Sequence, residues 1–151
     1  MKWNDNAPPA ENIRHRLPRR LRKYAAAGHA TFQSNKDWDA MHKFRIESKR
    51  MRYTLELFIE YFGPRYAELI DRVRHIQTLL GDVNDLVTAT RLLKGHEDAV
   101  DVRERFRVGT RKKFAKAHRY WKSEFGDEAL ERWVRYLQTQ ARSKSVEKTG
   151  T

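Results

Sequence analysis

The sequence predicts an all-α protein, a helical bundle of about five or six helices joined by short loops. Apolar residues recur every three or four positions along most of the chain, which is the period of an α-helix. No stretch shows the apolar–polar alternation typical of a strand. A length of 151 residues fits one domain with one core. We therefore expect a single helical domain at residues 10–141, a flexible segment at 1–9 and a disordered tail at 142–151.

The first two helices are predicted at about residues 10–34 and 39–62. Pro18 interrupts the first pattern, so the helix either kinks there or begins there. The second helix is expected to end at Gly63, because Gly and Pro terminate helices. Its N-cap candidates are Ser34, Asn35 and Asp37.

The rest of the chain predicts further helices of different lengths. A third helix is expected from about Pro64 to Gly81, where glycine interrupts the apolar pattern. A short fourth helix, capped by Asp82 or Asn84, would end near Gly95. The last two helices are expected at about residues 98–125 and 127–141.

The second predicted helix carries two separate stripes. At 100° per residue, four residues that carry or can carry positive charge fall within an arc of roughly 80°. These four form the basic stripe: His42, Arg45, Lys49 and Arg52. Like charges at such spacings repel one another by a few tenths of a kcal/mol per pair. Since the core-facing apolar residues occupy another arc, this helix is predicted to pack with one face and to bind an anion with the other.

Positive charge is unevenly distributed along the chain. The whole sequence has a formal net charge of +12. Residues 14–52 hold 12 basic and 3 acidic residues, residues 53–102 hold 5 and 9, and residues 103–122 hold 9 and 1. Two basic segments therefore flank an acidic one, which favours a polyanion as the partner.

Several other function classes lack support in the sequence. The chain has no cysteine, no apolar run near the ~20 residues of a membrane span, and no apolar segment after its first lysine. We therefore expect a soluble cytoplasmic protein. The six histidines form no metal-binding motif, and no phosphate-binding glycine loop or nucleophile–base pair stands out. We accordingly expect no metal, no cofactor and no enzymatic activity.

Two motifs resemble the conserved-histidine α-helical domain family, known as CHAD. The first is HKFRIESKRMRY at residues 42–53, followed by LELF, and the second is IQTLLGDVNDL at residues 76–86. The resemblance implies a helical bundle built from two similar halves that binds inorganic polyphosphate without catalysis. Because one clear copy of the first motif is present, the chain resembles the second half of the domain. Either a homodimer would complete the bundle, or the sequence is a fragment of a longer CHAD protein. The resemblance also implies an association with polyphosphate granules.

The expected polyphosphate site combines the basic stripe with basic residues elsewhere. Arg45, Lys49 and Arg52 follow one another by about one helical turn, ~5 Å, which suits successive phosphoryl groups. Arg74 resembles a basic position of the second family motif. Residues from the first and fifth predicted helices are expected to form opposite walls of a groove: Arg16, Arg19, Arg20, Arg111, Lys112 and Lys116.

Alternative interpretations remain open for the function and for single residues. The basic stripe would also suit a nucleic-acid backbone, an acidic protein partner, or a phosphohydrolase or phosphotransfer reaction with His42 as acceptor. Glu56 is expected to form a structural ion pair with Arg52 or Lys49. Four residues of the second motif are expected to form helix ends: Gln77, Gly81, Asp82 and Asn84.

Overall fold

The structure is a computed structural model that describes residues 2–34 and 37–142. The described chain forms five α-helices, two short 3₁₀ turns and no strand, which confirms the predicted all-α bundle. The helices are α1 (Pro9–Gln33), α2 (Trp38–Leu57), α3 (Tyr66–Leu92), α4 (Val100–Phe125) and α5 (Asp127–Gln140). The turns are η1 (Ile59–Tyr61) and η2 (Glu97–Ala99).

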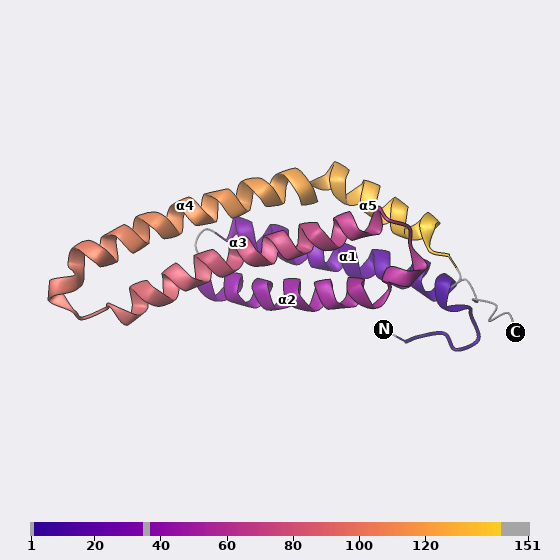
Figure 1. Ribbon diagram of the computed structural model, residues 1–151, viewed down its shortest axis with the longest axis horizontal. Helices are drawn as coiled ribbons and strands as arrows, with labels where there is room; N and C mark the ends of the chain where they lie inside the picture. Colours follow the sequence, from indigo (N-terminus) through magenta and orange to yellow (C-terminus); the bar gives the residue numbers. More distant parts are fainter. Residues whose placement is uncertain (1, 35–36, 143–151) are drawn as a thin grey trace, which may run out of the picture.

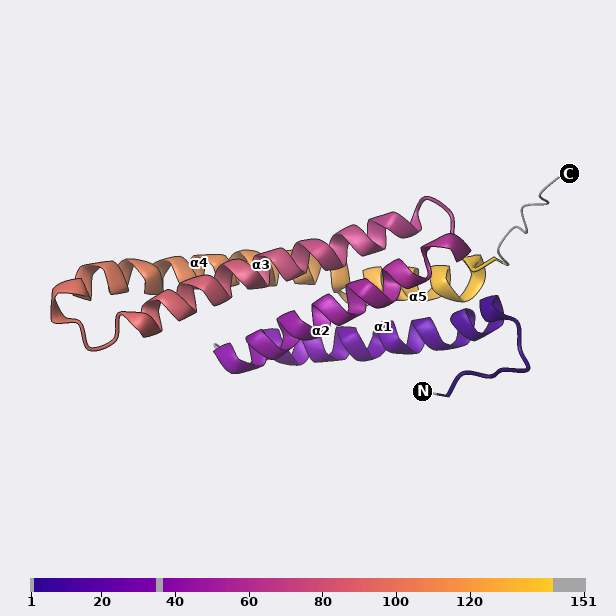
Figure 2. The same ribbon diagram turned by 60° about the horizontal axis from the view of Figure 1, so that its bottom comes forward.

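A long antiparallel hairpin of α3 and α4 forms the axis of the molecule (Figure 1). The two helices pack against each other, α2 packs on α3, and α1 packs between α2 and α5. The view in Figure 2 shows that α1 and α2 lie beside only one half of the hairpin. The other half, with η2 at its tip, therefore projects past the bundle.

An aromatic cluster holds α1, α2 and α4 together. Trp121 of α4 is 1% exposed and lies 5.2 Å from Phe44 and 4.5 Å from Phe125, between ring centroids. Tyr24 and Phe32 of α1 complete the cluster, each within 6 Å of Trp121. Such ring pairs stabilise by about 0.5–1.5 kcal/mol beyond their buried area, so this cluster is a major support of the core.

Two buried tyrosines of the core form hydrogen bonds with a neighbouring helix. The Tyr24 and Ser48 hydroxyls lie 2.8 Å apart, and the Tyr66 hydroxyl donates to the Leu55 carbonyl at 2.7 Å. Burial raises the pKa values of both tyrosines, because a phenolate would lose its hydration there. The two phenols therefore stay neutral and tie α2 to α1 and α3.

Some predicted helix boundaries are wrong. The helix α3 runs unbroken through Gly81, so the expected third and fourth helices are one. Glycine costs a helix interior about 1 kcal/mol, and burial of apolar residues on both sides of Gly81 outweighs that cost. The helix α1 begins at Pro9 and continues through the buried Pro18, which excludes a start at Pro18. The helix α2 ends at Leu57, before η1 rather than at Gly63.

The two ends of the chain were predicted to be flexible and disordered. Asn4 donates its backbone N–H to the Asn12 side chain at 2.9 Å, and Trp3 stacks on Phe58 at 6.4 Å. The expected flexibility of residues 1–9 stays a prediction. Residues 143–151 of the expected disordered tail lie outside the described residues.

Gly28 of α1 lies directly against the side chains of Trp121 in α4 and Phe44 in α2. A Cβ at this position would collide with the Trp121 ring and lie 2.7 Å from Phe44 Cζ. We expect Gly28→Ala to lower the free energy of unfolding by about 3 kcal/mol, because neither buried ring can move aside. Urea titration followed by circular dichroism measures the loss.

The matched control is Gly63→Ala, since a Cβ at Gly63 meets no atom within 4 Å. We expect that variant to change the free energy of unfolding by less than about 0.5 kcal/mol. Equal losses in both variants would contradict the packing explanation.

Candidate functional site

The candidate site begins with the way α2 is anchored. Asp37 caps its first turn by accepting the Ala40 N–H at 3.0 Å, as its place among the N-cap candidates predicted. One stripe of the helix is buried against the core: Met41, Phe44, Ser48, Met51 and Leu55. This packing fixes the rotation of α2 and thereby the direction of its other faces.

The basic stripe lies at the edge of α2 that meets α3. Arg45 lies over Gly81, where an added Cβ would be 3.4 Å from the Arg45 Nε. Counted from this contact along two antiparallel helices of equal rise, Lys49 is expected to be level with Gln77. Glu56 lies 3.6 Å from Arg52 and 3.5 Å from Arg74, so these two arginines are neighbours. The structure therefore brings Arg74 beside the stripe, as expected.

Several polar groups of this edge lack partners within the described part of the chain. The Nε atoms of Arg45 and Arg52 are buried without a hydrogen bond, and so is the Oε1 of Gln77. His42 and Lys49 are exposed, and neither they nor Arg45 has a carboxylate within 4.0 Å among the described residues. Buried donors without acceptors are uncommon, so this edge is suited to receive acceptor oxygens from outside.

Glu56 neutralises one end of the edge in part. Its carboxylate lies 3.6 Å from the Arg52 Nε and 3.5 Å from an Arg74 nitrogen, and Arg74 also contacts Asp71 at 2.7 Å. The expected ion pair between Glu56 and Arg52 is thus confirmed. Arg52 also lies 4.8 Å from the ring centroid of the exposed Tyr53.

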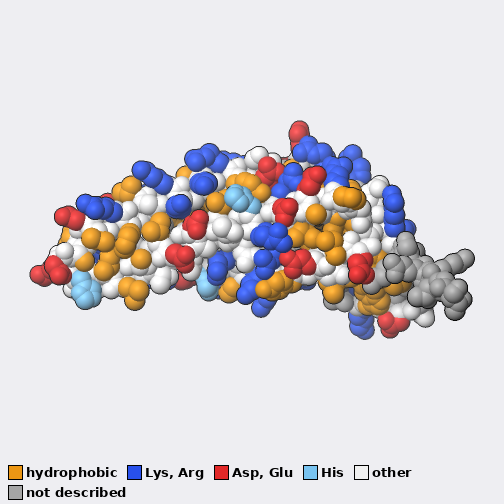
Figure 3. All heavy atoms as spheres, in the orientation of Figure 1, with side chains coloured by type: hydrophobic (Ala, Val, Ile, Leu, Met, Phe, Trp, Pro, Cys, Tyr) orange, Lys and Arg blue, Asp and Glu red, His pale blue; other side chains and the backbone are white. Residues whose placement is uncertain are grey.

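We call this set the α2–α3 basic edge: His42, Arg45, Lys49, Arg52 and Arg74. Figure 3 shows Lys and Arg side chains gathered near the middle of this face, where α2 and α3 lie side by side, with acidic side chains around them. This distribution of charge attracts anions to the basic edge. The neighbouring acidic side chains weaken the positive potential around it.

Comparison with known protein families matches the CHAD domain over residues 1–94, which include α1, α2, α3 and the whole basic edge. The chain belongs to the CHAD family. Comparisons with curated proteins and with solved structures find no match. The match also covers both motifs on which the resemblance was based.

The arginines of α1 lie away from the basic edge of this CHAD domain. Arg20 lines a cavity with Glu47, which is about 160° around α2 from Arg45. Arg16 and Arg19 line another cavity beside the N-terminal segment, where Arg16 contacts the Asn12 side chain at 3.4 Å. The structure does not bring these three residues to the edge, and their role in binding stays a prediction.

The basic residues of α4 are also separate from the edge. Arg111 pairs with Glu104 at 3.7 Å, and Lys112 and Lys116 are exposed. The helix α4 contacts α1, α3 and α5, and Arg111 lines a cavity with Trp38 and Arg107 rather than with the basic stripe. Among the described residues these side chains do not lie at the basic edge, and their part in a groove with two walls stays a prediction.

Gln77 and Gly81 contribute to the edge in a way the sequence analysis missed. Both were expected at a helix end, whereas both lie in the interior of α3. Gly81 faces Arg45 of α2, and the Gln77 Oε1 is buried without a hydrogen bond. Their spacing of four residues on one helix face was the available signal.

Within the described residues, no helix combines the length and apolarity that a membrane crossing requires. The described part of the chain also holds no group of three His, Asp or Glu side chains arranged as metal ligands.

We expect Glu56→Gln to raise the affinity of the edge for inorganic tripolyphosphate about threefold, because Arg52 and Arg74 lose a competing carboxylate. Calorimetric titration at low ionic strength measures the change. The control is Glu47→Gln, which removes the same charge from the Arg50 pair elsewhere on α2. A similar gain in both variants would mean that net charge alone decides binding.

Proposed function

We propose that this CHAD domain binds inorganic polyphosphate along the α2–α3 basic edge and catalyses no reaction on it. The observation that carries the proposal is the pair of buried Nε donors, on Arg45 and Arg52, that form no hydrogen bond in the described structure. The nearest carboxylate to the Arg52 Nε is Glu56 at 3.6 Å, beyond hydrogen-bond distance. The family assignment supports the same ligand, since CHAD domains are known in general terms to bind polyphosphate.

Polyphosphate matches the chemistry of the edge. The polymer carries about one negative charge per phosphate and presents only oxygen acceptors, so its recognition is ionic and geometric. The guanidinium groups of Arg45 and Arg52 donate in planar forks, and Lys49 between them adds a point charge. Successive groups about one helical turn apart can therefore contact successive phosphates.

The surroundings of the edge favour an extended ligand. Gly81 has no side chain, so the surface of α3 beside Arg45 is not raised by one. A chain of phosphates can therefore approach the guanidinium from the α3 side. The Gln77 amide, level with Lys49, can rotate to present its NH₂ group to a phosphate oxygen. His42 at one end and Arg74 at the other are exposed and extend the same line.

Nucleic acid is the competing ligand, because a phosphodiester backbone also offers a row of oxygens. The proposal requires that long-chain polyphosphate displaces duplex DNA and RNA from the protein when phosphate concentrations are equal. If DNA or RNA displaces polyphosphate instead, the nucleic-acid function is favoured.

We expect Arg45→Gln to weaken polyphosphate binding about tenfold, since it removes a charged hydrogen-bond donor. We expect Lys49→Gln to lower the slope of log affinity against log salt by about one, because one fewer counterion is displaced. Titrations of long-chain polyphosphate at several salt concentrations measure both effects.

The chain supplies matched controls on the same helix. Arg50→Gln and Lys43→Gln remove the same charges from exposed positions outside the basic edge, where Arg50 already pairs with Glu47 at 2.7 Å. Affinity losses as large in these two variants would contradict the proposed site.

A further inference from the structure

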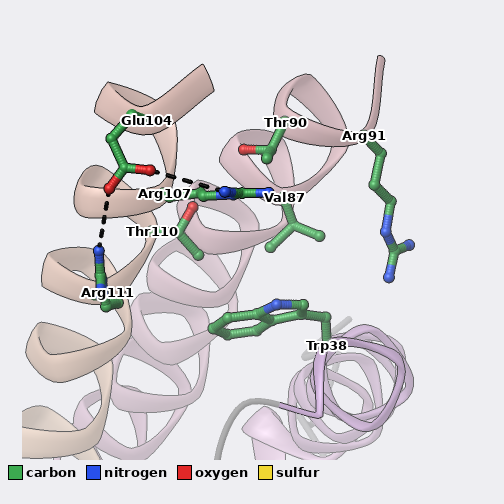
Figure 4. A pocket seen from close by; sticks show the side chains of 8 residues that line it. All are labelled: Trp38, Val87, Thr90, Arg91, Glu104, Arg107, Thr110 and Arg111. Atoms are coloured by element: carbon green, nitrogen blue, oxygen red, sulfur yellow. Dashed lines mark ion pairs between the residues drawn. The ribbon is translucent and has the colours of Figure 1, made fainter. Parts of the chain in front are cut away.

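A cavity separate from the basic edge lies where α2 begins against the α3–α4 hairpin (Figure 4). Its volume is about 450 Å³, within the range of about 300–1,000 Å³ typical of small-molecule sites. Three arginines and one glutamate line it, so its formal charge is positive. The cavity can therefore hold one compact anion rather than a long polymer.

Trp38 gives this cavity an aromatic wall. Its indole is partly buried, and Phe114 supports it from the core in an edge-on contact at 5.9 Å. Figure 4 shows the ring below Val87 and Thr110, at the base of the cavity. An accessible indole held in place by a core contact can stack against a flat ring of a ligand.

The arginines that line the cavity form ion pairs with carboxylates but no hydrogen bonds with them. Arg107 and Arg111 lie 3.8 and 3.7 Å from Glu104, and Arg91 lies 3.6 Å from Asp39. None of these contacts is a hydrogen bond. Arg50, Arg72 and Arg74 elsewhere bond to carboxylates at 2.7 Å. The guanidinium forks around the cavity thus form no hydrogen bond with their carboxylate partners, and their N–H groups can donate to phosphate oxygens in pairs.

Two threonine hydroxyls add acceptors to the same wall. Thr90 and Thr110 donate to carbonyls of their own helices at 2.8 and 2.7 Å, which leaves lone pairs of each oxygen unused. These oxygens can accept from an amino group on a ring that is stacked on Trp38.

We propose that this cavity binds a nucleotide, with the base stacked on Trp38 and the phosphates held by Arg91, Arg107 and Arg111. The inference is independent of the polyphosphate function, because no residue of the basic edge lines the cavity. It gives the domain a second, small-molecule anion site at the base of the projecting hairpin.

The test uses the full chain and three probes without divalent metal: ATP, inorganic tripolyphosphate and adenosine. We expect ATP to bind about tenfold more tightly than tripolyphosphate, because base stacking adds to the phosphate contacts. Adenosine should bind weakly for lack of phosphate. Because both phosphate-bearing probes can also bind the basic edge, the titrations use the full chain carrying Arg45→Gln and Lys49→Gln, which weaken that edge. Calorimetry gives the three affinities, and tripolyphosphate binding as tight as ATP binding in this background would overturn the proposal.

Trp38→Leu should lower the affinity for ATP about tenfold and leave that for tripolyphosphate unchanged. Trp3→Leu is its control, since Trp3 stacks on Phe58 outside the cavity. Undiminished ATP affinity in Trp38→Leu would overturn the proposal.

Arg107→Gln provides a second test. Arg107 is exposed, so we expect its substitution to leave the fold intact. We expect this variant to weaken ATP binding, while Arg105→Gln, the same change on another face of α4, does not. This comparison is also made in the Arg45→Gln and Lys49→Gln background, which separates this cavity from the polyphosphate site. Equal ATP affinity in Arg107→Gln and the unmodified chain would overturn the assignment.

Discussion

The rotation of α2 within the bundle is the constraint on which the proposed site depends. Phe44, Met51 and Leu55 are at most 2% exposed, and their burial leaves the helix one orientation. In that orientation Arg45 and Arg52 cannot point fully into solvent, because their arc borders the packed stripe. Their Nε atoms are therefore buried, the Arg45 Nε beside Gly81 of α3. The same packing that stabilises the bundle thus leaves two guanidinium donors without a hydrogen bond among the described residues.

The features that the sequence predicted correctly are local ones. The two stripes of α2, its cap at Asp37 and the ion pair of Arg52 with Glu56 all depend on spacing within one helix. Spacing within a helix follows from a fixed geometry, so residue order is sufficient to predict it. The family resemblance rested on motifs of the same local kind, and the match over residues 1–94 agrees with it.

The features that could not be predicted depend on packing between distant segments. Gly81 was expected to end a helix because its propensity disfavours helix, but contacts along both neighbouring turns override that local cost. To predict whether Arg20 and Arg111 line one groove, one must know which helices face each other. The periodicity of a sequence contains no such information. The cavity beside Trp38 joins residues about 70 positions apart in sequence, so no motif marks it.

The most direct measurement is nuclear magnetic resonance of the arginine Nε–Hε groups during a titration with polyphosphate. The account predicts that the signals of Arg45 and Arg52 shift and that their exchange with water slows, since phosphate oxygens then accept these hydrogens. The signal of Arg50, which already bonds to Glu47 through its terminal nitrogen, should change little. Unchanged Arg45 and Arg52 signals at saturating polyphosphate would contradict the central claim.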